Sequence, residues 1–190
     1  MLLFGPFREN LGTQMRCYYL LDQPEQAFSF ATDVYSDPGT PESIKRTALI
    51  WLGRIHFDSE EYDKALNCFE STVKFGGNAG AESQFMISKI NYNLGDYESA
   101  ETNIFNLVSD FPSYDEWKFK GFLLLVKTYI GLNDLFQARA TAESIMENVD
   151  VEWVQNACSD LMMDIESMEG KELNGTELIE TGTQNEVNDK

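Results

Sequence analysis

Hydrophobic residues recur every three or four positions along most of the chain, which is the period of an α-helix that buries one face. The pattern is clearest between residues 49 and 73. One apolar stripe consists of Leu49, Leu52, Gly53 and His56. A second stripe consists of Tyr62, Ala65, Leu66, Phe69 and Val73. The short polar segment 58–61 between them permits only an antiparallel helical hairpin.

The same hairpin pattern occurs four times. Four alanines occupy equivalent places in it, with spacings of 38, 35 and 38 residues: Ala27, Ala65, Ala100 and Ala138. Self-similarity at such a period is typical of stacked helical repeats. We therefore predict an all-α fold, an α-solenoid of about four hairpins. The predicted repeats cover residues 8–41, 42–80, 81–115 and 116–150.

Segments rich in Gly and Pro at 36–41, 76–80 and 110–115 predict the loops that join the repeats. After the fourth repeat, apolar residues between Val151 and Ile165 predict one more amphipathic helix over 151–167, which would cap the last hairpin. The solenoid would then span residues 1–168. Residues 169–190 are rich in acidic residues and lack aromatic ones, so we expect a disordered acidic tail.

Small residues have predicted packing roles. A larger side chain than the repeated alanine would push the two helices of a hairpin apart. Gly53 would admit the neighbouring helix, and Gly95 would end the first helix of its repeat. The third repeat fits less well, because Gln84, Ser88 and Asn91 stand where apolar residues are expected.

Charge narrows the classes of partner. The chain has 190 residues, 32 acidic and 14 basic, with a formal net charge of −18. Nucleic-acid binding depends on basic residues that neutralise phosphates, and anionic membrane surfaces also attract basic segments, so both partners are disfavoured. Cys17, Cys68 and Cys158 are far apart and form no paired motif, so we expect small buried apolar residues and neither a disulfide scaffold nor a zinc site.

Residues suited to catalysis do not form a recognisable group. His56 is the one histidine, and it lies on a helix-packing stripe. The sequence contains no phosphate-binding glycine loop, zinc-protease motif or serine-hydrolase motif. We therefore predict a protein that is not an enzyme, with no cofactor and no metal.

These repeats resemble the tetratricopeptide repeat (TPR) over residues 8–148. The second repeat matches the family pattern at Leu49, Leu52, Gly53, Tyr62, Ala65 and Phe69, and it departs from it at His56, Glu60, Thr72 and Gly77. The third matches at Ile87, Gly95, Tyr97, Ala100 and Pro112, and the fourth at Phe122, Leu125, Tyr129 and Ala138. The resemblance implies a scaffold that binds a protein or peptide in a concave groove.

Residues 93–100 and 115–145 are also similar to the C-terminal end of long TPR proteins of bacterial cell envelopes. This resemblance implies that the chain is the end of a longer solenoid, in the periplasm or envelope of a bacterium. A complete protein of this sequence would instead be expected in the cytoplasm. The predicted function is a protein-interaction scaffold within a bacterial envelope assembly, with no nucleic-acid partner and no membrane insertion.

One position of the repeat is basic in all four copies, and the family places it on the groove. The four basic residues are Arg16, Arg54, Lys89 and Lys127. Helical spacing puts apolar and aromatic residues on the same face: Tyr19, Phe57, Tyr92, Ile50, Phe85 and Leu123. This column predicts a groove for an acidic, partly apolar peptide. In the other interpretation, the basic residues form ordinary ion pairs with neighbouring carboxylates.

Two further hypotheses remain open from the sequence. The chain could be a structural or oligomerising segment of a longer solenoid, since Trp51, Met86 and Leu124 could support self-association. The acidic tail could occupy the groove itself through residues 177–180.

Overall fold

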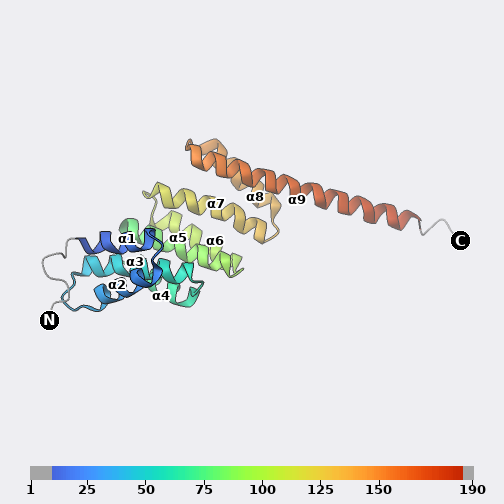
Figure 1. The fold of residues 1–190 in the computed structure, drawn as a ribbon. Coiled ribbons are helices and arrows are strands. Elements are labelled where there is room, and N and C mark those ends of the chain that lie inside the picture. Colours follow the sequence, from blue (N-terminus) through green and yellow to red (C-terminus); the bar gives the residue numbers. More distant parts are fainter. Residues whose placement is uncertain (1–9, 186–190) are drawn as a thin grey trace. The chain divides into compact units, whose positions relative to one another are not determined.

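The computed structural model describes residues 10–185, with side chains as far as residue 170. Within this range the chain forms helices and no strand, which confirms the all-α prediction (Figure 1). The helices are α1 (Leu11–Leu20), α2 (Pro24–Ser36), α3 (Glu42–Asp58), α4 (Tyr62–Val73), α5 (Gly77–Asn93), α6 (Tyr97–Asp110), α7 (Asp115–Gly131), α8 (Leu135–Asn148) and α9 (Glu152–Asn185).

The chain divides into two compact units, residues 1–121 and 122–190, with the boundary inside α7. Unit 1 contains α1 to α6 and the first part of α7. Unit 2 contains the rest of α7, α8 and α9. The sequence predicted one solenoid over 1–168, and the continuity of the four hairpins across this boundary stays a prediction.

In unit 1, successive helices pack as hairpins, α1 with α2, α3 with α4 and α5 with α6. The first helices also contact one another, α1 with α3 and α3 with α5. We call the surface formed by α1, α3 and α5 the first-helix face. The second helices begin at equivalent places, at Pro24, Tyr62 and Tyr97, as the alignment on the alanines predicts.

The repeated alanines lie where the helices of a hairpin meet. Ala27, Ala65, Ala100 and Ala138 are at most 1% exposed. In the second hairpin, a Cβ at Gly53 would lie 2.8 Å from Cε1 of Phe69, so any side chain there would displace this fully buried ring. The packing role predicted for Gly53 is therefore confirmed.

The second residue after each first helix has a left-handed backbone. The φ angles are 55° at Asp22, 58° at Glu60, 77° at Gly95 and 57° at Asn133. Gly95 adopts this conformation without strain, which confirms its predicted role as a terminator. The three residues with a Cβ occupy a region that costs most side chains free energy.

The predicted loop at 76–80 is wrong for residues 77–80, because α5 begins at Gly77. Gly76 and Gly77 have φ angles of 67° and 66° and make the turn. Gly80 is instead a packing residue: a Cβ there would lie 2.8 Å from Cε1 of Phe111. The glycine cluster therefore serves both the turn and the close approach of α5 to its neighbour.

Two polar side chains of α5 that stand at apolar positions, Gln84 and Ser88, are buried and hydrogen-bonded. The amide nitrogen of Gln84 donates to Oδ1 of Asn103 on α6 at 2.9 Å and to the Asn103 carbonyl at 3.2 Å. The Ser88 hydroxyl donates to the Gln84 carbonyl at 3.0 Å. These bonds explain why the third repeat can place polar residues at apolar positions.

In unit 2, α9 packs on α8. The buried residues of α9 are Val154, Cys158, Leu161 and Ile165, and those of α8 are Leu135, Ala138, Ala142 and Ile145. The guanidinium of Arg139 donates to the carboxylate of Glu169, with Nη2 and Oε2 2.5 Å apart. This contact ties α9 to α8 beyond the apolar interface.

The predicted end of the helical part near residue 168 is corrected by the structure, because α9 continues as a helix to Asn185. The chain contains no proline after Pro112, so no residue in this segment lacks the amide hydrogen that helical bonding needs. Residues 186–190 lie outside the described residues. The side chains of residues 177–180 lie outside the described residues, so their predicted contact with a groove stays a prediction.

Candidate interaction surface

The first-helix face brings together the residues that sequence analysis placed there in unit 1. Arg54, Phe57 and Lys89 project from adjoining helices, as two contacts across α3 and α5 show. Arg16 is exposed, and the aromatic and apolar residues are partly exposed: Tyr19, Ile50, Phe57, Phe85 and Tyr92. The face therefore combines accessible π-systems with basic side chains.

Arg54 already has a carboxylate partner. Its Nε donates to Oε1 of Glu82 on α5 at 2.6 Å, and Nη2 also approaches this oxygen. The guanidinium lies over the Trp51 ring, 4.4 Å from its centroid. Glu82 is only 5% exposed, so its charge needs this partner. Arg54 therefore matches the alternative interpretation, an intramolecular ion pair between neighbouring helices.

Tyr19 and Asp58 make a second link between helices. The Tyr19 hydroxyl donates to Oδ2 of Asp58 at 2.5 Å, and its ring lies 5.0 Å from that of Trp51. Burial and the Asp58 carboxylate together raise the pKa of Tyr19 to about 12. The phenol therefore remains protonated and serves as a fixed donor between α1 and α3.

Lys89 is the basic residue whose charge remains available in the middle of this face. Its Nζ lies 4.9 Å from the centroid of the Phe57 ring, and it has no carboxylate partner within the described part of the chain. Tyr92 follows one turn later on α5 and pairs with Tyr97 at 5.5 Å. Burial and the neighbouring Tyr97 raise the pKa of Tyr92. An ammonium beside aromatic rings suits an anionic, partly apolar ligand.

Some predicted groove residues also belong to the core. Phe57 and Phe85 pack against the cluster of Ala65, Phe69 and Ile90, and Phe85 also lies 5.8 Å from the Trp117 ring. Their aromatic character therefore has a packing reason besides any role in binding.

The equivalent residues of unit 2 differ from one another in exposure. Lys127 is exposed, whereas Leu123 is 9% exposed and offers little surface. Trp51, Met86 and Leu124, which suggested self-association, are each buried, at 8%, 9% and 7% exposure. Those three residues therefore give no support to an oligomerising role.

Other residues that could suggest chemistry have structural partners. Nδ1 of His56 lies 2.6 Å from Oε2 of Glu61, and hydrogen bonds from Lys64 and His56 lower the pKa of this exposed carboxylate. Cys68 is half-buried and Cys158 is buried, but Cys17 is exposed, so the prediction of a buried Cys17 is wrong. Among the described residues, no group of three or more His, Cys, Asp or Glu could hold a metal ion.

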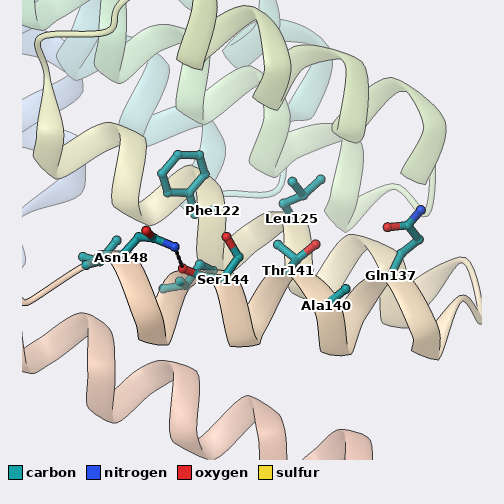
Figure 2. A pocket seen from close by; sticks show the side chains of 9 residues that line it. Phe122, Leu125, Gln137, Ala140, Thr141, Ser144 and Asn148 are labelled. Carbon is teal, nitrogen blue, oxygen red and sulfur yellow. Dashed lines mark hydrogen bonds between the residues drawn. The ribbon is translucent and has the colours of Figure 1, made fainter.

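A pocket of about 460 Å³ lies in unit 2 between α7 and α8. Figure 2 shows the Phe122 ring above Thr141 and Ser144 of α8, with the Asn148 amide hydrogen-bonded to the Ser144 carbonyl at 2.8 Å. The lining residues carry no charge and include no histidine or cysteine. Its polar groups are the amides of Gln137 and Asn148 and the hydroxyls of Thr141 and Ser144.

Two adjoining pockets lie in unit 1, beside the turns that follow α1 and α3, and the sequence did not predict them. In the sequence, the one signal near these pockets is the pair of adjacent leucines Leu20 and Leu21. In the structure, both side chains are about two-thirds exposed, at 65% and 66%.

Within the part of the chain that the structure describes, none of the helices has the length and apolar character that crossing a lipid bilayer requires.

Comparisons with known proteins identify the fold. No protein-family model and no curated protein sequence matches the chain. A solved structure of nearly identical TPR-like repeats, from a Podosopora anserina protein described as a kinesin light chain, matches with a TM-score of 0.66 and 14% identity, over 96% of this chain and 97% of that one. A single-substitution variant of that protein matches with a TM-score of 0.67 and 13% identity, over 91% of each chain. The chain therefore has the fold of TPR-like repeats.

Proposed function

We propose that unit 1 is a protein-interaction module whose first-helix face binds a peptide segment of a partner. The fold of TPR-like repeats supports a scaffold of this kind. The observation that carries the proposal is the Lys89 ammonium, which lies 4.9 Å from the centroid of the Phe57 ring without a carboxylate partner in the described part of the chain. A lysine held in this way is ready to accept an anion from outside.

The partner segment is acidic and partly apolar. A carboxylate would pair with Lys89, while an apolar side chain would lie against the partly exposed rings of Phe57 and Tyr92. Arg54 contributes less than the sequence suggests, because its guanidinium is already bound to Glu82. Arg16 is exposed on α1 and would extend the basic surface toward the first hairpin.

A matched peptide array tests this function. Each peptide carries two apolar residues between flanking Glu, Ser or Lys residues, with blocked termini. We expect the full chain to bind members of the Glu-flanked set, and Lys89→Glu to weaken that binding by about ten-fold. Lys74→Glu is the control, because it makes the same change of charge at an exposed lysine after α4.

Equal losses in the two variants would show that only net charge matters and would contradict the proposed face. An absence of Glu-flanked peptides among the bound set would contradict the proposed partner. Arg54→Glu is a poor probe, because it would place two carboxylates together at the buried Glu82 and disturb the fold.

The second part of the proposal places this module in a bacterial envelope assembly. It is supported by the similarity of residues 93–100 and 115–145 to the ends of long envelope TPR proteins. Fractionation of cells that make the natural full-length protein tests it. Recovery in the envelope or periplasm would support this placement, and recovery in the cytosol would contradict it.

A further inference from the structure

Two adjoining pockets form a cleft beside the hairpin turns of the first two repeats. The ribbons of these repeats, α1 to α4, are coloured blue to cyan in Figure 1. The two pockets have volumes of about 460 and 520 Å³ and share Pro24, Ile55 and Ser59. We call this surface the turn cleft. Its volume is in the range of pockets that hold a few side chains or a small ligand.

The floor of the turn cleft is apolar. Ile55 is 6% exposed and lines one pocket of the cleft together with Pro24 and Phe28. Phe28 itself is 40% exposed and meets the His56 ring edge-on at 5.5 Å. Leu20 lines the other end and is 65% exposed. Exposed apolar residues gathered at one cavity are a feature of interaction sites.

The rim of the turn cleft is acidic. Its carboxylates are Asp22, Glu25, Asp58 and Glu61, and its one lysine is Lys64. Lys64 and His56 both bind Glu61, and Tyr19 donates to Asp58. The side-chain carboxylates of Asp22 and Glu25 accept no hydrogen bond and form no ion pair within the described part of the chain. Two carboxylates therefore remain available beside an apolar floor.

We propose that the turn cleft binds a basic, partly apolar segment of a partner protein. An aliphatic or aromatic side chain would fill the space over Ile55, and a neighbouring Lys or Arg would pair with Glu25 or Asp22. The chain's net charge of −18 favours the approach of a cationic segment to this acidic surface.

The turn cleft is distinct from the first-helix face in its charge and its residues. Tyr19 borders both surfaces, but Lys89 and Phe57 do not line the cleft. The cleft is therefore a second interaction surface, and it selects the opposite charge. Loss of binding at one surface leaves the other proposal intact, because the two are tested by different peptide sets.

The test uses the Lys-flanked set of the same array and the full chain. We expect Glu25→Lys to weaken binding of that set by about ten-fold. Glu98→Lys is the matched control, because Glu98 stands at the equivalent place in the first turn of α6 and makes the same change in net charge. Binding that is lost equally in both variants reflects general attraction to an acidic protein and would overturn the proposal.

A second pair of variants tests the apolar contact. Leu20→Ser removes an exposed apolar side chain from the cleft, while Leu94→Ser removes one that is 56% exposed at the end of α5, outside it. We expect only Leu20→Ser to weaken the Lys-flanked peptides, with unchanged thermal unfolding in both. Light scattering measures whether the chain associates with itself. Self-association that Leu20→Ser abolishes would assign the cleft to a second copy of the chain and overturn the proposed partner-protein site.

Discussion

The second and third hairpins fill the same positions with different chemistry. In α3 and α4, Leu49 and Cys68 are the apolar residues at two positions where α5 and α6 carry Gln84 and Asn103. Gly53 and Ser88 likewise occupy one position, where the glycine admits the Phe69 ring and the serine bonds the Gln84 carbonyl. Both hairpins nonetheless bury their central alanine completely, Ala65 and Ala100.

The spacing of the helices therefore depends on side-chain volume and on satisfied hydrogen bonds more than on hydrophobicity. A buried amide is tolerated when its donors and acceptors have partners, as the contact of Gln84 with Asn103 shows. The second hairpin relies on close packing of a large ring on glycine. Substitutions in the two hairpins should therefore lower the free energy of unfolding for different reasons.

The largest expected effect is in the second hairpin. Gly53→Leu should lower the free energy of unfolding by about 3 kcal/mol, because even a Cβ would lie 2.8 Å from the Phe69 ring. Ser88→Ala at the equivalent place should cost about 1 kcal/mol or less, because its hydroxyl bonds only a carbonyl of its own helix. Urea unfolding of both variants checks this, and equal losses would show that the two hairpins pack alike.

In the third hairpin, Asn103→Ala should cost about 1 kcal/mol, because it removes the Oδ1 acceptor at 2.9 Å and leaves the buried Gln84 amide only the backbone carbonyl of residue 103 at 3.2 Å. The double change Gln84→Leu with Asn103→Cys copies the second hairpin and should recover part of that loss. Equilibrium unfolding of the single and double variants measures the coupling. If the double variant is less stable than Asn103→Ala alone, the two hairpins are not interchangeable at these positions.

The sequence predicted the parts of the fold that depend on periodicity. The alanine spacing placed the hairpins, and the second helices begin at the aligned positions Tyr62 and Tyr97. It could not predict that Gly80 packs inside a helix, because glycine marks both turns and close contacts. It also could not show that Arg54 is bound to Glu82 from another repeat, because that pairing depends on how neighbouring helices are placed.

A smaller effect concerns the turns that end α3 and α5. Gly95→Ala should cost about 1 kcal/mol, because its φ of 77° strains a side chain although no atom lies within 4 Å. Glu60→Gly at the equivalent turn should gain about 0.5 kcal/mol by relieving strain at a φ of 58°. Thermal unfolding of both variants is the measurement. A destabilised Glu60→Gly would show that the left-handed backbone costs little at this turn.

The smallest effect is a pH dependence that separates Tyr92 of the third hairpin from Phe57, its counterpart in the second. Burial and Tyr97 raise the pKa of Tyr92, so the folded chain holds its phenolic proton more tightly than the unfolded chain does. This contribution to stability is present below about pH 10 and is lost as pH rises through the folded pKa. Tyr92→Phe should therefore flatten the alkaline decline of the unfolding free energy, and an unchanged slope would contradict this.

The proposed binding face is tested most directly by amide hydrogen exchange of the full chain with and without a bound Glu-flanked peptide. The account predicts added protection in the parts of α3 and α5 that carry Phe57, Lys89 and Tyr92. It also predicts that Lys89→Glu abolishes this protection at the same peptide concentration. Protection confined to the second helices α4 and α6, or to the turn cleft around Glu25, would contradict the assignment of acidic-peptide binding to the first-helix face.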